Sequence, residues 1–360
     1  MKISLALVTT SLLLAVLLAC GAPRAAAPTS APSPLAAASP APASSGAATA
    51  PVASAPTPAA RQTINLGVVN LSAIFWPLYA GLDEGIFDRA GFDVELVVTR
   101  SSPDGMAAML GGSLELNVVS ADTIVLAQTR GADAIGVAGL ANKASYSLIV
   151  QPEIQQITDL RGKTLGASAL RAGEVVFLKE LLKYHGLTEN DYNLVVAGPS
   201  RNRVSAMTTH QIDGTIMPPP DSYLLEDAGL RHLGEVSEAV PEFQFQLLAV
   251  TRSWAQANED TLIRFLRAYS ESLRWLYDPA NKERAIAILA QRMNLDDDHA
   301  RRTYTAWVEQ EQFWSKRGEF TQPGLDAMEQ ILISSGEATP PLPPRDRYTD
   351  SHYLERAMVP

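Results

Sequence analysis

Asp159-Leu160-Arg161-Gly162-Lys163-Thr164-Leu165-Gly166-Ala167-Ser168 has the pattern of a tight turn that leads into a buried strand. Gly162 and Gly166 bracket the short run between them, and glycine adopts turn conformations at little steric cost. Arg171-Ala172-Gly173-Glu174 then begins a segment in which Val175, Leu178, Leu181 and Leu182 fall on one face of a helix. A strand followed by a helix is the repeating unit of a parallel sheet, so the pattern predicts an α/β block that begins here.

The same alternation extends in both directions from this block. We predict an α/β fold with two lobes, each a mainly parallel sheet with helices on its faces, joined by a two-stranded hinge. The first lobe spans residues 62–150 and the second spans 151–246, while residues 247–360 return to the first lobe with one strand and a helical tail. The expected strands are 63–69, 92–98, 114–120, 134–140, 145–150, 163–168, 192–197, 212–217 and 246–251, and the expected tail helices are 258–277, 282–293, 296–314 and 322–335.

The first sixty residues have a different composition. Lys2 and the apolar run that follows it form a signal peptide over residues 1–20, because the run is too short to span a bilayer comfortably. Leu17-Leu18-Ala19-Cys20 resembles the bacterial lipobox, in which the cysteine is lipidated, and Cys20 is the only cysteine of the chain. Residues 21–61 are rich in alanine and proline and predict a disordered tether. An ordinary signal peptide with a chance cysteine is the alternative.

Charge and motifs exclude several classes of protein. Residues 62–360 carry 26 basic and 39 acidic side chains, a balance that repels nucleic acid. The acidic run Asp296-Asp297-Asp298-His299 precedes a helical pattern and lacks the spacing of a calcium loop, so we expect no metal there. The five histidines show no metal-binding spacing, and no nucleophile elbow or phosphate-binding loop occurs. We therefore expect neither a cofactor nor catalysis.

Several motifs resemble one family. Asp159-Leu160-Arg161-Gly162-Lys163 is the most specific; the others are the aromatic turn from Phe75 to Gly81 with Glu84-Gly85-Ile86-Phe87 after it, the run from Met109 to Leu116, and the closing Tyr348-Thr349-Asp350. Together they resemble the extracytoplasmic solute-binding proteins of ABC importers, in the NMT1-like group for nitrate, sulfonates, taurine and thiamine precursors. The resemblance covers nearly everything after the tether.

The resemblance implies a periplasmic-binding-protein type II fold and a definite role. A monomer, anchored by lipid at the outer face of the cell membrane, would capture a small organic or oxyanionic nutrient between its lobes and deliver it to permease subunits. Two alternatives remain open. One is an enzyme of the same fold that acts on a pyrimidine or chorismate-derived metabolite, and the other is a ligand-sensing receptor domain. Sulfonate, nitrate, a pyrimidine and a flavin all remain candidate ligands.

Candidate ligand contacts of the first lobe follow two of its strands. Ser72 stands where a helix begins, and Phe75, Trp76 or Tyr79 could stack on a planar ligand. Packing of these aromatic residues in the core is the alternative. A second set of polar groups, Ser120 and Asp122, begins the helix after the strand 114–120, where unpaired backbone N–H groups are available.

The second lobe offers a similar set. Ser168 and the helix start formed by Arg171, Ala172 and Gly173 could bind an anion or a carbonyl, with Arg171 adding a bidentate contact. Simple capping by Ser168 and a solvated Arg171 are the alternatives. After the strand 212–217 the chain reads Pro218-Pro219-Pro220-Asp221-Ser222-Tyr223. We expect Pro219, Asp221 and Tyr223 at the cleft, with Asp221 as the helix N-cap.

Overall fold

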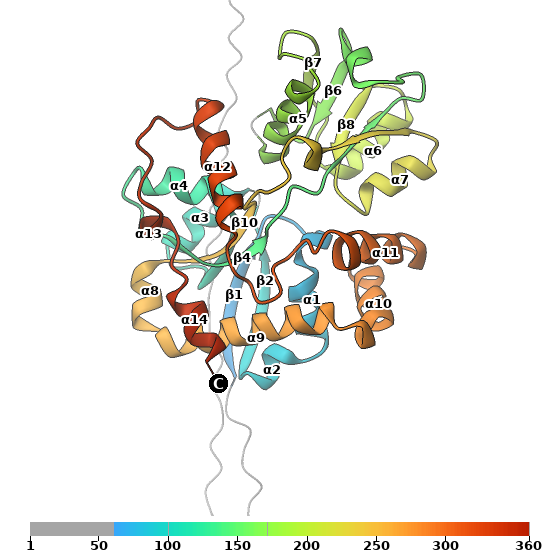
Figure 1. Cartoon of the computed structure of the whole chain (residues 1–360). Coiled ribbons are helices and arrows are strands. Elements are labelled where there is room, and N and C mark those ends of the chain that lie inside the picture. Colours follow the sequence, from blue (N-terminus) through green and yellow to red (C-terminus); the bar gives the residue numbers. More distant parts are fainter. Residues whose placement is uncertain (1–60, 100, 171, 360) are drawn as a thin grey trace, which may run out of the picture. The chain divides into compact units, whose positions relative to one another are not determined.

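The computed structural model describes residues 61–99, 101–170 and 172–359. It forms two α/β lobes, each built on a five-stranded sheet (Figure 1). The predicted signal peptide, Cys20, Arg171 and the predicted tether up to residue 60 lie outside the described residues.

The first sheet has the strand order β2-β1-β3-β10-β4. Its strands β1 and β2 are parallel, as are β1 and β3, whereas β10 runs antiparallel to both of its neighbours. The bounds are β1 Gln62–Val68, β2 Phe92–Val98, β3 Leu116–Ser120, β4 Ile135–Ala141 and β10 Gln246–Val250.

The second sheet repeats this arrangement with the order β7-β6-β8-β5-β9. Here β6 pairs in parallel with β7 and β8, and β5 is the antiparallel strand. The prediction of mainly parallel sheets is confirmed, with one antiparallel strand in each. The bounds are β5 Ser147–Val150, β6 Thr164–Ala167, β7 Asn193–Val196, β8 Gly214–Met217 and β9 Arg231–Glu235.

Two segments of chain connect the lobes, as the predicted hinge requires. Residues 142–146 lead from β4 to β5, and residues 236–245 lead back from β9 to β10. The predicted boundary after residue 150 is therefore wrong by several residues, because β5 belongs to the second sheet. Sequence alone could not reveal this, since β4 and β5 are both fully buried apolar strands.

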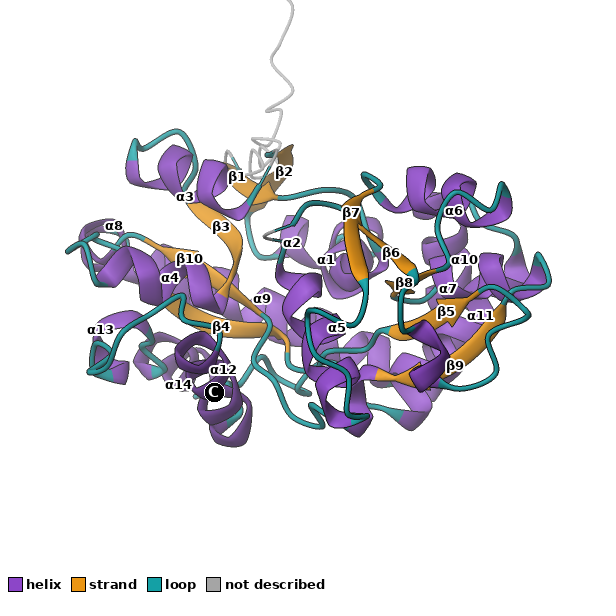
Figure 2. Cartoon of the chain, turned by 90° about the horizontal axis from the view of Figure 1, so that it is seen from above, coloured by secondary structure: helices purple, strands orange, loops and turns teal. Residues whose placement is uncertain are grey.

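Helices cover both sheets (Figure 2). The tail that follows β10 is helical, as predicted, and the expected helix 296–314 is α11 followed by a π-helical turn over Thr305–Gln310. The helices are α1 Trp76–Asp83, α2 Ile86–Arg89, α3 Ser102–Leu110, α4 Ala121–Gln128, α5 Gly173–Tyr184, α6 Ser200–Thr208, α7 Asp221–Asp227, α8 Arg252–Ala257, α9 Glu259–Tyr277, α10 Lys282–Met293, α11 Asp297–Tyr304, α12 Gln322–Ser334, α13 Arg345–Tyr348 and α14 His352–Met358.

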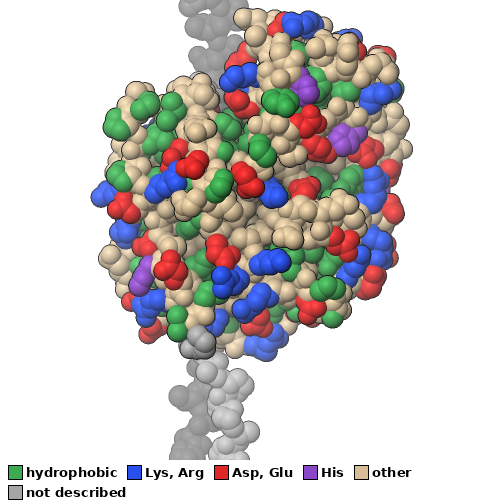
Figure 3. Space-filling view, viewed as in Figure 1, with side chains coloured by type: hydrophobic (Ala, Val, Ile, Leu, Met, Phe, Trp, Pro, Cys, Tyr) green, Lys and Arg blue, Asp and Glu red, His purple; other side chains and the backbone are tan. Residues whose placement is uncertain are grey.

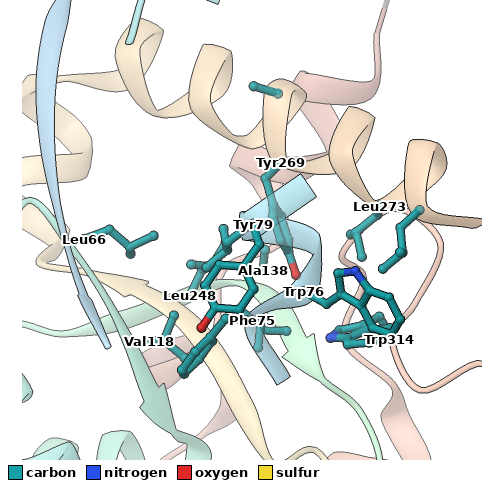
Figure 4. Close-up of a cluster of buried hydrophobic side chains, with 14 of the residues drawn as sticks. Leu66, Phe75, Trp76, Tyr79, Val118, Ala138, Leu248, Tyr269, Leu273 and Trp314 are labelled. Carbon is teal, nitrogen blue, oxygen red and sulfur yellow. The ribbon is translucent and has the colours of Figure 1, made fainter. Parts of the chain in front are cut away.

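Helix α9 shows why the tail returns to the first lobe. Its buried residues include Leu262, Phe265, Leu266, Tyr269 and Leu273, which recur at helical spacing on one face. The Tyr269 hydroxyl donates a hydrogen bond of 3.0 Å to the Gly139 carbonyl of β4. Figure 4 shows Tyr269 and Leu273 packed with side chains from α1 and the first sheet. No described helix is long and apolar enough to cross a bilayer.

Candidate functional site

A pocket of about 460 Å³, part of it open to solvent, lies between the two lobes. The first lobe lines it with Asp122 of α4 and with apolar residues of α12. The second lobe contributes Ala172 and Gly173 at the start of α5. Three predicted ligand contacts, Asp122, Ala172 and Gly173, therefore come together although they are about fifty residues apart in the chain.

Aromatic side chains form one wall of this pocket. Phe177 of α5 packs at right angles to Phe243, with ring centroids 4.8 Å apart, and its centroid is 5.3 Å from that of Phe245. Phe243 and Phe245 belong to the segment that returns to the first lobe, so the wall spans the hinge. Gly173 lies close to this wall, since a side chain added there would begin 3.4 Å from the Phe245 ring. Met328, Ile331 and Leu332 of α12 also line the pocket.

The start of α4 supplies the polar groups on the first-lobe side. Ser120 is the N-cap residue, and its hydroxyl lies 2.8 Å from that of Thr123. Burial raises the pKa of the Asp122 carboxyl, and a hydrogen bond from Ser120 partly offsets the shift. Asp122 forms no ion pair among the described residues. A half-buried carboxyl that has no charged partner among the described residues therefore faces the pocket.

The turn after β6 is held by a buried ion pair. The amide of Ser168 donates a 3.0 Å hydrogen bond to Glu174, and the Ser168 hydroxyl bonds the same oxygen. Arg203 of α6 is 4% exposed, donates to the Ile216 carbonyl at 2.8 Å and lies 3.9 Å from the Glu174 carboxylate. Ser168 is thus engaged with the first turn of α5, and its hydroxyl does not point free into the pocket. These two hydrogen bonds tie the end of β6 to the first turn of α5.

The segment after β8 lies beside this pair. Pro219 is buried, and Asp221 is the first residue of α7 rather than its N-cap, which is Pro220. Burial raises the pKa of Asp221, while a hydrogen bond from Ser200 and the charge of Arg203 partly counter the shift. The predicted capping role is therefore wrong, because the triple-proline turn itself sets the helix start. Neither Pro219 nor Asp221 lines the pocket.

Tyr223 belongs to a contact between the lobes rather than to the pocket. The Arg302 guanidinium of α11 lies 4.1 Å from the centre of the Tyr223 ring. Arg302 also bonds Glu226 at 2.8 Å and Asp227 at 2.9 Å, so one arginine of the tail holds three side chains of α7. Burial raises the pKa of Tyr223 to about 12. This cluster links the lobes on the side of α11 (Figure 1).

The aromatic residues predicted near the first strand lie in the core, which corrects the expectation that they stack on a ligand. Trp76 is fully buried, donates its indole N–H to the Ala285 carbonyl at 3.0 Å and packs edge-on against Trp314. Phe75 and Tyr79 are each 1% exposed, and Figure 4 shows both beside Trp76 in this cluster. These residues pack in the core, which was the alternative in the sequence analysis, because the tail helices cover α1.

Three other predicted residues have different outcomes. Ser72 precedes the 3₁₀ turn Ala73–Phe75, and its hydroxyl is buried with no hydrogen-bond partner among the described residues. Arg171 and Cys20 lie outside the described residues, so their predicted roles remain predictions.

Acidic and basic side chains are interspersed on the face shown in Figure 3. The Asp296 carboxylate accepts a hydrogen bond from the His299 amide, so this acidic run caps α11. Among the described residues, no group of three His, Asp or Glu side chains is placed to hold a metal ion.

Sequence reasoning missed the aromatic wall and the Arg203–Glu174 pair. Phe243 and Phe245 stand two residues apart just before a buried strand, a spacing that gives no sign of a pocket. Arg203 follows a proline-led helix start and looks like a surface residue in sequence. Only the approach of α6 to the ends of β6 and β8 makes it buried.

Comparisons with known proteins agree with this architecture. The model of the family "NMT1/THI5 like" matches residues 72–282. The putative binding protein YtlA of Bacillus subtilis is 22% identical over 293 residues, which cover 78% of this chain and 85% of YtlA. Among solved structures, the periplasmic aliphatic sulphonate-binding protein SsuA of Escherichia coli superposes with a TM-score of 0.63 at 16% identity, covering 81% of this chain and 99% of SsuA. The periplasmic nitrate-binding protein NrtA of Synechocystis gives 0.67 at 14% identity, with 82% and 88% coverage.

The matched region contains both crossings between the lobes and every described residue that the second lobe contributes to the pocket. The chain belongs to the NMT1/THI5-like family.

Proposed function

We propose that this protein is a lipid-anchored receptor that captures a small molecule outside the cell and delivers it to an ABC import permease. The observation that supports this most is the pocket itself, whose walls come from α4 and α12 on one lobe and from α5 on the other. A ligand that contacts both lobes favours the arrangement in which they approach each other, because contacts with both lobes form only there. Such a change is what a permease could recognise.

The proposed contacts are the residues that the pocket brings together. Asp122 offers a carboxyl, the backbone at Ala172 and Gly173 begins α5, and Phe177, Phe243 and Phe245 supply apolar surface. Ser120 and Ser168 do not contact the ligand directly in this proposal, because their hydroxyls already form hydrogen bonds within their own turns. No bond needs to be made or broken in such a site.

Anchoring by lipid at Cys20 is the second part of the proposal, and we infer a monomer that acts at the outer face of the cell membrane. Support comes from the lipobox pattern and from the alanine- and proline-rich residues 21–61, which would carry the folded lobes away from the bilayer. Labelling cells with a palmitate analogue tests it: wild type is labelled and found in the membrane fraction, whereas Cys20→Ala is not labelled. Equal labelling of both would refute the anchor.

Ligand binding is tested by thermal unfolding of the protein without its first 57 residues, in the presence of sulfonates, nitrate, pyrimidines and flavins. A ligand at one hundred times its Kd stabilises the folded state by about 2.7 kcal/mol. We expect a saturable rise in unfolding temperature with one of these classes. A flat response to all of them, and to an extract of the growth medium, would contradict the binding function.

A further inference from the structure

The composition of the pocket carries an inference about its ligand, which rests on the proposed function. Most of its lining is apolar: α5 and the segment that returns to the first lobe contribute Val176 and three phenylalanines, and α12 contributes Met328, Ile331 and Leu332. Surface of this kind gains free energy by covering a ring or chain of carbon atoms, at about 25 cal/mol per Å² buried. A small hydrated oxyanion would lose its water there without covering that surface. The ligand therefore has an apolar body.

Among the described residues, the charged groups that line the pocket are Asp122 and Glu337, and both are acidic. Glu337 is already engaged in an interaction of its own, so Asp122 is the acid considered for the ligand. Asp122 forms no ion pair with any described residue, as noted above. Arg171 lies outside the described residues and takes no part in this argument. A sulfonate or carboxylate at this position would face a carboxylate in a poorly hydrated space, which is unfavourable.

The positions of the carboxyl and the aromatic rings favour a cation. Aromatic faces attract organic cations, and this attraction grows when water is excluded. A carboxylate that accepts a hydrogen bond from a charged N–H group forms the stronger, charge-assisted kind of bond. We propose that the pocket takes an organic cation with an aromatic ring, the ring against Phe177, Phe243 and Phe245 and the charged nitrogen paired with Asp122.

Three probes of similar shape but different charge test this class: 2-phenylethylammonium, 2-phenylethanol and benzenesulfonate, each titrated calorimetrically into the tether-less protein. We expect the ammonium compound to bind at least tenfold more tightly than the alcohol, and the sulfonate to bind more weakly than either. Asp122→Asn should lower the ammonium-to-alcohol affinity ratio about tenfold. Asp298→Asn makes the same change of charge at an exposed residue of α11 and serves as the control, so its affinity ratio should equal that of wild type.

The outcomes distinguish a failure of the proposed ligand class from a failure of the proposed solute-binding function. Tighter binding of benzenesulfonate, lost when Gly173→Leu fills the pocket, would overturn the cationic class and leave the solute-binding function standing. An unchanged affinity ratio in Asp122→Asn would also overturn the class. Failure of all three probes, together with no stabilisation by any compound of the wider thermal screen, would overturn both.

Discussion

We expect the ion pair between Arg203 and Glu174 to stabilise the part of the second lobe that lines the pocket. Both side chains are nearly buried, at 5% and 12% exposure, and their charged atoms are 3.9 Å apart. At an effective dielectric constant of about 20, the attraction at that distance is about 4 kcal/mol. Arg203→Met removes this attraction and the hydrogen bond to Ile216, and it leaves the Glu174 carboxylate without its partner. We expect the unfolding free energy to fall by about 3–5 kcal/mol.

The partner variant separates charge from packing. Glu174→Gln keeps an acceptor oxygen for Ser168 but leaves the buried Arg203 guanidinium without its charged partner, so we expect a loss of about 3 kcal/mol. In the double variant no charge is stranded, and its loss should be about 2 kcal/mol smaller than the sum of the single losses. Urea unfolding of the tether-less protein measures all three values. Losses that add within about 0.5 kcal/mol would refute the pairing.

Three further predictions concern other parts of the molecule. Trp76→Phe removes the indole N–H that bonds Ala285 and leaves a small cavity, so urea unfolding should show a loss of about 2–3 kcal/mol with unchanged ligand affinity. Arg302→Gln removes the contacts with α7, and spin labels placed one on each lobe should then report a wider distribution of distances. The pKa of His232 is raised, chiefly by its hydrogen bond to Glu235, so its protonated form stabilises the fold. That stabilisation is fully present below the ordinary histidine pKa and disappears as the pH rises through the raised value, so the unfolding-temperature difference between wild type and His232→Gln should shrink from pH 6 to pH 9.

Each of these has an outcome that would count against the structure. A Trp76→Phe protein with normal stability but weakened ligand binding would indicate that Trp76 contacts the ligand rather than packing only in the core. Distance distributions unaffected by Arg302→Gln would show that α11 does not restrain the lobes. A stability difference at His232 that grows with pH would mean that the neutral ring, not the charged one, makes the contact.

The fold was predictable because its signals are local. Alternating strands and helices and the block from Asp159 to Gly166 indicate two α/β lobes without knowledge of any long-range contact. The boundary at β5 failed because pairing partners are non-local: Ser147–Val150 would fit either sheet, and only its pairing with β8 and β9 decides.

The candidate site was predictable where it depends on strand ends. Asp122, Ala172 and Gly173 follow strands whose carboxyl ends face the cleft, and that rule holds for any sheet of this topology. Residues supplied by distant segments could not be found in this way. Ile331 and Leu332 belong to an ordinary amphipathic helix, and nothing in the sequence shows that α12 would close the pocket.

Native mass spectrometry of the protein, purified from cells under gentle conditions, tests most directly whether the pocket between the lobes holds the ligand. Wild type and Ala169→Leu, a substitution in the same turn but outside the pocket lining, should carry one small molecule per chain. Gly173→Leu, whose side chain starts 3.4 Å from Phe245, should fold normally and carry none. A bound molecule retained by Gly173→Leu at the same occupancy would place the ligand elsewhere and contradict the account.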